Sequence, residues 1–249
     1  MGLTAQLVRR ATIGAAVVGA LLAVPTPSRA QDYAAIVAAA DRSEADRQTD
    51  KRRDPVKLLA FTGVKAGMTV LDMGVGGGYS TELMARAVGP SGKVYGQDFE
   101  TSPRAKERFD ARMKTDAMKN VVALARPFDD PLPADVANVD LITFFFFYHD
   151  TTYMAVDRAA MNKKLFGALK PGGFLIIADH SAKPGAGTSV GKTLHRIEES
   201  VLRNEVEAAG FKLAASADFL RHPEDPRDER IFQPKVPVDE FVLKFQKPN

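Results

Sequence analysis

The sequence predicts an α/β domain built on a mostly parallel β-sheet with helices on both faces. Residues 70–80 pass from apolar β-forming residues into a turn with four glycines in five positions, and then into a helical pattern. Residues 140–147 are almost continuously apolar, as expected of a strand that is buried on both faces. Strand-like and helix-like stretches alternate along most of the chain, which is typical of this fold class.

Residues 1–30 have the composition of a secretory signal peptide. Arg9 and Arg10 precede an uncharged run over residues 11–24, and Ser28-Arg29-Ala30 places small residues before a cleavage site at Gln31. The run is shorter than the roughly 20 residues that a membrane-spanning helix needs. We therefore expect a periplasmic or secreted protein with no stable membrane insertion after cleavage, comprising one domain over residues 31–249.

Composition narrows the classes of partner. The first 30 residues contain three arginines and no acid, so the remaining chain has 31 basic and 31 acidic residues. This balance gives no support for a nucleic-acid partner. The chain has no cysteine and therefore no disulfide, so its stability must come from an apolar core. The sequence leaves the oligomeric state open.

Residues 31–62 form an N-terminal helical extension. We expect an alanine-rich helix, a break near residues 41–43, and a charged helix that is mostly exposed. Asp54 can cap a third helix, which starts at Pro55 and ends at Gly63. The simplest interpretation of the charged stretch is a solvated helix face.

The glycine-rich turn does not fit the dinucleotide-binding fingerprint. The third glycine of G-x-G-x-x-G falls on Tyr79 or on Thr81, depending on where the count begins. The turn fits instead an acid at the end of a strand followed by alternate glycines, at Asp72, Gly74, Gly76 and Gly78. This pattern resembles motif I of the class I S-adenosylmethionine (SAM) methyltransferases.

The resemblance covers roughly residues 60–247 and includes the turn Lys170-Pro171-Gly172-Gly173. It implies a Rossmann-like, seven-stranded sheet in the order 3-2-1-4-5-7-6 and SAM as the cofactor, with Asp72 near the sulfonium. It also offers a second interpretation of the charged helix in residues 31–62, as a lid over the cofactor. Three further stretches are similar to a group of exported bacterial predicted methyltransferases: Tyr148-His149-Asp150, Asp179-His180 and Leu194-His195-Arg196-Ile197.

Asp98 follows the second expected strand, residues 94–97, about 20 residues after the glycine turn. An acid at this point can accept both ribose hydroxyls of a nucleoside. Glu100 is the alternative acid. After a helix at 103–118 and a strand at 121–125, the resemblance implies that Phe128 lies against the adenine ring and that Asp129 accepts from its amino group.

Polar residues follow two later strands at the sheet edge where open α/β folds bind their substrates. Tyr148-His149-Asp150 follows residues 140–147, although Asp150 can instead cap the next helix, which ends at Leu169. Asp179-His180 follows the strand at 174–178. A loop of small residues at 181–189, long enough to cover a pocket, and a helix at 193–210 come next, and strands at 211–217 and 241–245 complete the expected sheet.

These residues suggest a mechanism of methyl transfer to a small-molecule acceptor. A histidine is the natural base for an acceptor O–H or N–H, so we expect His149 or His180 to act as base and Tyr148 to position the acceptor. His195 is expected to close the same pocket. Two alternatives remain open: a binding module without turnover, and a metal site built from His149, Asp150, Asp179 and His180, for which the sequence has no compact motif.

Overall fold

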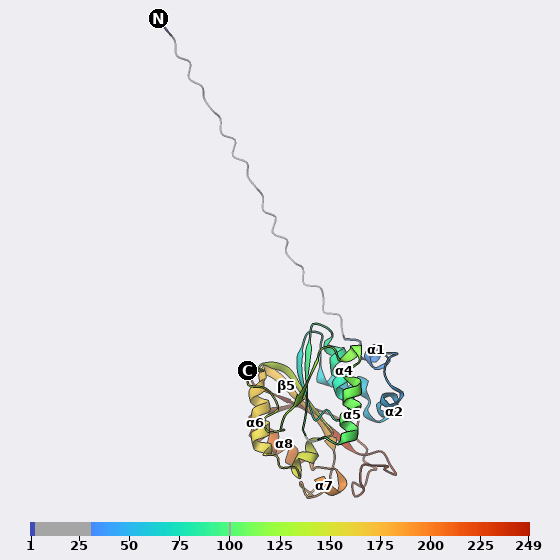
Figure 1. Ribbon diagram of the computed structural model, residues 1–249. Coiled ribbons are helices and arrows are strands. Elements are labelled where there is room, and N and C mark those ends of the chain that lie inside the picture. Colours follow the sequence, from blue (N-terminus) through green and yellow to red (C-terminus); the bar gives the residue numbers. More distant parts are fainter. Residues whose placement is uncertain (3–30, 100) are drawn as a thin grey trace. The chain divides into compact units, whose positions relative to one another are not determined.

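The computed structural model describes residues 1–2, 31–99 and 101–249. Residues Gln31–Asn249 form one compact unit (Figure 1). Residues 3–30 of the predicted signal peptide and Glu100 lie outside the described residues. Within the described part of the chain, no helix is both long and apolar enough to cross a membrane.

The sheet has seven strands in the order β3-β2-β1-β4-β5-β7-β6, which confirms the expected topology. All neighbouring strands are parallel except β7, which runs antiparallel to β5 and β6. The strands are β1 (Thr69–Met73), β2 (Lys93–Asp98), β3 (Val121–Ala125), β4 (Val139–Phe145), β5 (Leu169–His180), β6 (Lys212–Ala217) and β7 (Glu240–Gln246).

Helices cover both faces of the sheet. In Figure 1, α4 and α5 lie on one side of the strands and α6 and α8 lie on the other. The α-helices are α1 (Tyr33–Val37), α2 (Glu44–Arg53), α3 (Pro55–Thr62), α4 (Tyr79–Val88), α5 (Pro103–Arg112), α6 (Arg158–Ala168), α7 (Gly191–Leu194) and α8 (Glu199–Ala208). Two short 3-10 turns, η1 (Asp116–Met118) and η2 (Tyr148–Thr152), complete the described elements.

Alternate residues of the central strands supply the two halves of the core. Val70 and Leu141 pack with α3 and α4, whereas Leu71 and Ile142 face the layer that contains α6 and α8. Successive side chains of a strand point to opposite faces, so a strand between two helical layers must be apolar at almost every position. The apolar run at residues 140–147 thus reflects a strand covered on both sides.

Three element boundaries differ from those expected. The helix expected at 193–210 is two helices, α7 and α8, because the chain bends at His195, which has a left-handed backbone with φ of 56°. The helix expected at 103–118 ends at Arg112 and is followed by η1. Strand β4 ends at Phe145, since Phe146 also has a positive φ of 58°.

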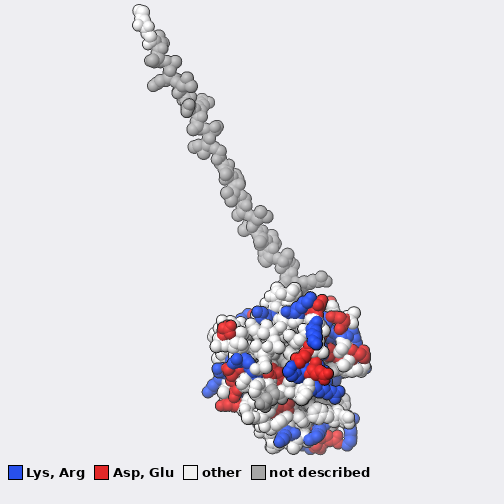
Figure 2. Space-filling view, viewed as in Figure 1, with Lys and Arg blue, Asp and Glu red and all other residues white. Residues whose placement is uncertain are grey.

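The charged side chains of residues 31–249 show both signs intermixed on the face in Figure 2, where basic and acidic groups alternate over the surface. Many of them form ion pairs, such as Lys106 with Asp110 on α5. Intermixed charge of this kind does not indicate the class of partner. The expectation of a small-molecule partner depends instead on the functional site, which lies at the carboxyl ends of the strands.

Candidate active site

The glycine turn between β1 and α4 is shaped by close packing and by positive φ angles. Gly74, Gly76 and Gly78 have φ values of 65°, 51° and 80°. A Cβ atom on Gly74 would lie 2.9 Å from the ring of Phe147, and one on Gly78 would lie 2.7 Å from Phe109. A Cβ on Gly76 would meet no atom within 4 Å. Two glycines therefore permit close packing, and the middle one borders open space.

Asp72 lies beneath this turn and is fully buried. Its carboxylate accepts hydrogen bonds from the hydroxyls of Thr143 (2.7 Å), Thr81 (2.7 Å) and Ser80 (3.0 Å). Burial raises the pKa of Asp72, and these hydroxyls oppose the shift. The expectation that this carboxylate faces the sulfonium is corrected: both of its oxygens bind side chains of the protein, and they hold the turn from below.

Asp98, in contrast, reaches the turn itself. Its Oδ2 accepts a hydrogen bond of 2.8 Å from the N–H of Gly76, and its Oδ1 accepts one from the N–H of Phe99. Burial raises its pKa, although these backbone donors favour the ionised form. Asp98 is partly exposed and contacts Gly76, where the sequence predicts a ribose, but it is not among the residues that line the cavity over the turn.

A cavity of about 630 Å³ opens above the glycine turn. This size lies within the range of roughly 300–1,000 Å³ that is usual for small-molecule sites. Its walls come from the glycine turn, helix α2, helix α5 and the three phenylalanines at the end of β4, Phe145, Phe146 and Phe147. Because α2 forms one wall, the structure supports the second interpretation of the charged extension, a cover over the cofactor site.

Ion pairs attach α2 to the body of the domain. Arg112 of α5 donates to both carboxylate oxygens of Asp46 on α2, at 2.8 and 2.9 Å, and also to Glu82 on α4. Arg42 donates to Asp50, which in turn accepts from the hydroxyl of Tyr79 at 2.6 Å. The cover is therefore fixed by buried charges from three different helices.

Arg53, at the end of α2, brings an unpaired positive charge to the cavity. Its guanidinium lies 4.4 Å from the ring centre of Phe146 and 5.2 Å from that of Tyr79. Among the described residues it forms no ion pair, and its Nε has no hydrogen-bond partner. Burial lowers its pKa to about 10, so the side chain is still protonated at neutral pH.

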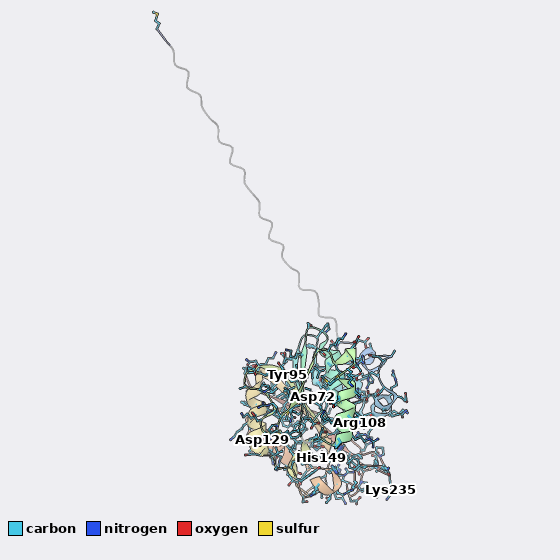
Figure 3. All side chains as sticks on the ribbon, in the orientation of Figure 1. Asp72, Tyr95, Arg108, Asp129, His149 and Lys235 are labelled. Atoms are coloured by element: carbon cyan, nitrogen blue, oxygen red, sulfur yellow. The ribbon has the colours of Figure 1, made fainter. Side chains whose placement is uncertain are left out.

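The residues assigned to the adenine do not line this cavity. Phe128 is 1% exposed and stacks between Phe144 and Phe147, with ring centres 6.0 and 5.1 Å away. Asp129 lies on the α6 side of the domain, away from Arg108 of α5 (Figure 3). Both expectations are corrected: the loop after β3 turns its phenylalanine into the core and its acid outward.

Tyr148 is also placed differently from the expectation. Its side chain is fully buried on the α6 and α8 side, where its hydroxyl donates to Glu205 (2.9 Å) and accepts from Asn162 (2.8 Å). Burial raises its pKa. The phenol cannot position an acceptor, because the left-handed backbone of Phe146 ends the strand two residues early and η2 turns Tyr148 into the core.

His149, His180 and His195 do come together. The ring centre of His149 lies 5.5 Å from that of His180 and 5.4 Å from that of His195. However, none of the three lines the cavity over Gly76, because the ring of Phe146 stacks on His180 at 5.2 Å and lies between them and the cavity. The prediction of one shared cleft is therefore corrected to a histidine cluster that is adjacent to the cavity.

Asp179 orients His149 within this cluster. Its carboxylate accepts from the backbone N–H of His149 at 2.8 Å and lies 2.7 Å from the ring Nδ1. Burial disfavours the charged imidazole, but Asp179 and Asp150 outweigh it and raise the pKa of His149 to about 10. A histidine that is protonated at neutral pH is a poor general base, so the expected role of His149 as base is not supported.

His180 is fully enclosed beside Glu240. Its Nδ1 lies 2.9 Å from Glu240 Oε1 without the alignment of a hydrogen bond. Burial lowers the pKa of His180 well below its usual value and raises that of Glu240 to about 7. Because its ring is enclosed, His180 does not reach the cavity, and the structure does not support it as the base.

Comparison with known proteins gives the family. A family model described as a methyltransferase domain matches residues 64–216, which include the glycine turn, Asp98 and both histidine-bearing strand ends. The chain belongs to the SAM-dependent methyltransferases of the class I fold. The expected fold, enzyme class and cofactor are thereby confirmed.

Individual relatives agree with this assignment. Demethylmenaquinone methyltransferase from Lactococcus lactis is 32% identical over 130 residues, which are 50% of this chain and 47% of that protein. The chloroplastic 2-phytyl-1,4-beta-naphthoquinone methyltransferase from Arabidopsis thaliana is 28% identical over 121 residues, or 49% and 45% of the two chains. The chain thus matches about half the length of these curated relatives.

The fold is shared with solved structures. A SAM-dependent methyltransferase from Aquifex aeolicus has a TM-score of 0.58 and 22% identity, and covers 86% of this chain and 98% of its own. At this identity the likeness shows the fold alone.

The sequence did not point to Arg53, Arg112 or Asp46 as parts of the site. All three belong to charged stretches that resemble ordinary solvated helix faces. Arg112 and Asp46 are 66 residues apart, so no local spacing reveals their ion pair. The sequence carried only a weaker signal, the unusually charged helix α2 in the extension that precedes the first strand.

Proposed function

We propose that this chain transfers the methyl group of SAM to a small aromatic acceptor that carries ring oxygens, such as a reduced quinone. The observation that supports it most is the cavity over Gly76, which combines the cofactor turn with three phenylalanine residues and an unpaired arginine. Aromatic walls suit a flat ring, and a guanidinium suits an oxygen that carries negative charge. The proposal thus narrows the expected small-molecule acceptor to one chemical class, aromatic rings that carry oxygen.

The two cofactor-binding elements have separate tasks in this proposal. The open space over Gly76 admits the nucleoside, and the carboxylate of Asp98 accepts from the ribose hydroxyls. Helix α2 then covers the bound cofactor and excludes water from the reaction.

The chemical step is an in-line displacement. An electron pair of the acceptor, on oxygen or on an electron-rich ring carbon, forms a bond to the methyl carbon. The carbon–sulfur bond breaks, its electrons stay on sulfur, and S-adenosylhomocysteine leaves. Where a ring carbon has attacked, that carbon then loses its own proton to water and the ring becomes aromatic again. The protein contributes alignment and desolvation, since the sulfonium is already a strong electrophile.

We propose that Arg53 stabilises the acceptor anion and that no histidine acts as a base. No histidine lines the cavity, so the acceptor must arrive as an anion or lose an acidic hydroxyl proton to water. A protonated arginine within reach lowers the pKa of such a hydroxyl and stabilises the anion. Reduced quinones have hydroxyls of this kind, whereas the oxidised ring is electron-poor and is not a nucleophile.

The names of the curated relatives support this acceptor class. Both describe methyltransferases of naphthoquinone-type or menaquinone-type molecules. From these names we adopt for this chain only one feature of the acceptor, an aromatic ring that carries oxygen.

The test is a methyl-transfer assay with radiolabelled SAM and 1,4-naphthoquinone in its reduced and oxidised forms. We expect label in the reduced ring only. Arg53→Met should lower turnover by roughly 10²-fold or more with SAM affinity unchanged. Arg47→Met, on the same helix but outside the cavity wall, is the matched control.

The outcomes separate the alternatives. A loss of SAM affinity in Arg53→Met would assign that arginine to the cofactor's carboxylate. Tight SAM binding with no labelled product from any reduced quinone would contradict the acceptor class and favour a binding module.

We also propose export to the periplasm or the exterior. The support is the pattern of residues 1–30, with paired arginines, an uncharged run and small residues before Gln31.

A further inference from the structure

A second constellation of side chains lies outside the cavity, at the ends of β4 and β5. His149 and Asp150 belong to η2, and His195 directly follows α7. These elements are more than 40 residues apart in the chain. Two imidazoles and a carboxylate thus meet here, although none of them lines the proposed methyl-transfer site.

The three ligand-type atoms form a nearly equilateral triangle. His149 Nε2 lies 3.3 Å from His195 Nδ1 and 3.2 Å from Asp150 Oδ1, and His195 Nδ1 lies 3.1 Å from the same Oδ1. Ligand atoms about 2.1 Å from one ion lie roughly 3.0 Å apart at right angles and roughly 3.4 Å apart at the tetrahedral angle. All three distances fall between these limits, and an ion would sit about 1 Å out of the plane of the triangle.

The groups around the triangle hold the ligands in orientation. Asp179 lies 2.7 Å from His149 Nδ1 and holds the ring so that Nε2 faces the triangle. An ion that binds there displaces the proton from Nε2, and Nδ1 keeps its own proton against Asp179. A carboxylate behind a histidine in this way is the usual support of a metal-binding imidazole. Asp150 is supported similarly, because the hydroxyl of Tyr153 donates to its Oδ1.

The backbone is shaped to bring the two elements together. A Cβ atom at Gly191 would collide with Thr152 Oγ1 and would lie 3.0 Å from the carbonyl oxygen of His149. Only glycine at this position lets α7 pack against η2. His195 then adopts its left-handed backbone, with φ of 56°, and so carries its imidazole back to His149.

We infer that His149, Asp150 and His195 bind one divalent transition-metal ion. Two imidazole nitrogens and one carboxylate oxygen favour Zn²⁺ or Fe²⁺ over Mg²⁺ and Ca²⁺, which prefer oxygen ligands alone. Three protein ligands leave at least one coordination position for water or for an oxygen of a small molecule. The ion links η2 to α7, one aromatic layer away from the methyl-transfer cavity.

The site does not depend on the proposed acceptor. Its ligands are separated from the cavity by His180 and the ring of Phe146. Metal binding and methyl transfer can therefore be measured independently on the same protein, and the failure of one leaves the other standing.

The experiment is a calorimetric titration of the purified full chain with Zn²⁺ after removal of metals with a chelator. We expect saturable binding of one ion per chain, with Mg²⁺ unable to compete at equal concentration. Co²⁺ should give the visible absorption bands of a coordinated ion. Asp150→Asn and His195→Gln should each weaken Zn²⁺ binding by at least about 10-fold.

The controls distinguish a metal site from a hydrogen-bond network. His222→Gln removes the histidine that lies outside the histidine cluster, 3.3 Å from Glu224, and should bind Zn²⁺ like the wild type. His195 is partly exposed, so His195→Gln is expected to fold, and its thermal unfolding without metal should match that of the wild type. Zn²⁺ should raise the unfolding temperature of the wild type and of His222→Gln but not that of His195→Gln. Absence of one-to-one binding, or equal losses in His195→Gln and His222→Gln, would overturn the inference.

Discussion

The carboxylate of Asp98 accepts a hydrogen bond of 2.8 Å from the backbone N–H of Gly76. This contact joins the end of β2 to the middle of the glycine turn. Asp98 is therefore held at the edge of the open space over Gly76, with its position fixed before any ligand arrives. The contact brings two residues that are 22 positions apart together at the proposed cofactor site.

Replacing Asp98 should weaken SAM binding. Asp98→Ala removes the acceptor for the ribose hydroxyls, and we expect a loss of about 1–3 kcal/mol, measured by calorimetry. The matched control is Asp129→Ala, since Asp129 lies away from the cavity. If both variants bound SAM like the wild type, the ribose would lie elsewhere.

Much of the fold and of the cofactor turn was predictable from local signals. The spacing of Gly74, Gly76 and Gly78 reports directly on backbone angles and close packing within one short segment. The apolar run of β4 likewise reports on burial of both faces. These features are determined by residues that are close together in the sequence, so they can be predicted from a short segment of it.

Other features were not predictable, because they depend on distant partners or on one backbone angle. The ion pair of Arg112 with Asp46 joins helices that are far apart in the chain. The positive φ of Phe146 reverses the direction of the residues after β4. The sequence predicts Tyr148 at the acceptor, but this change of direction places it in the core. The histidine cluster likewise lies beside the cavity rather than in it.

Removing the charge of Arg112 should destabilise the cover over the cofactor. Arg112→Met leaves the buried carboxylate of Asp46 without its arginine and leaves Glu82 with Arg86 alone, which should cost about 3 kcal/mol in the free energy of unfolding. Urea denaturation measures this loss. The double variant Asp46→Asn/Arg112→Met should recover part of it, and Arg104→Met, an exposed arginine of the same helix, should change little. Equal stability of Arg112→Met and Arg104→Met would show that these ion pairs do not hold α2.

The unfolding free energy should depend on pH through Glu240. Burial raises the pKa of this carboxyl to about 7, although Arg52 lies 2.7 Å from it. Because the folded state favours the protonated form, the stabilising contribution is complete below about pH 4.5 and is lost as the pH rises through 7. The wild type should thus lose up to about 3 kcal/mol relative to Glu240→Gln between pH 4.5 and 7.5. Parallel pH profiles of the two proteins in denaturant titrations would rule out this role.

Export should remove residues 1–30. The small residues at Ser28 and Ala30 precede the expected cleavage point, so N-terminal sequencing of protein recovered outside the cytoplasm should start at Gln31 or within a few residues of it. Recovery of cytoplasmic protein that retains Met1 as the main form would contradict the proposal.

The central claim, that SAM binds over the glycine turn, is tested most directly by a matched pair of glycine variants. Gly76 and Gly187 have similar positive φ angles, 51° and 57°, and a Cβ on either meets no atom within 4 Å. Alanine at either position should therefore cost a similar amount of stability, about 1–2 kcal/mol. Only the Cβ of Gly76→Ala projects into the space where the cofactor is expected.

The deciding measurement is calorimetric titration of both variants with SAM. We expect Gly187→Ala to bind SAM like the wild type and Gly76→Ala to lose at least about 10-fold in affinity. Equal SAM affinity in the two variants and the wild type would contradict a cofactor site above Gly76.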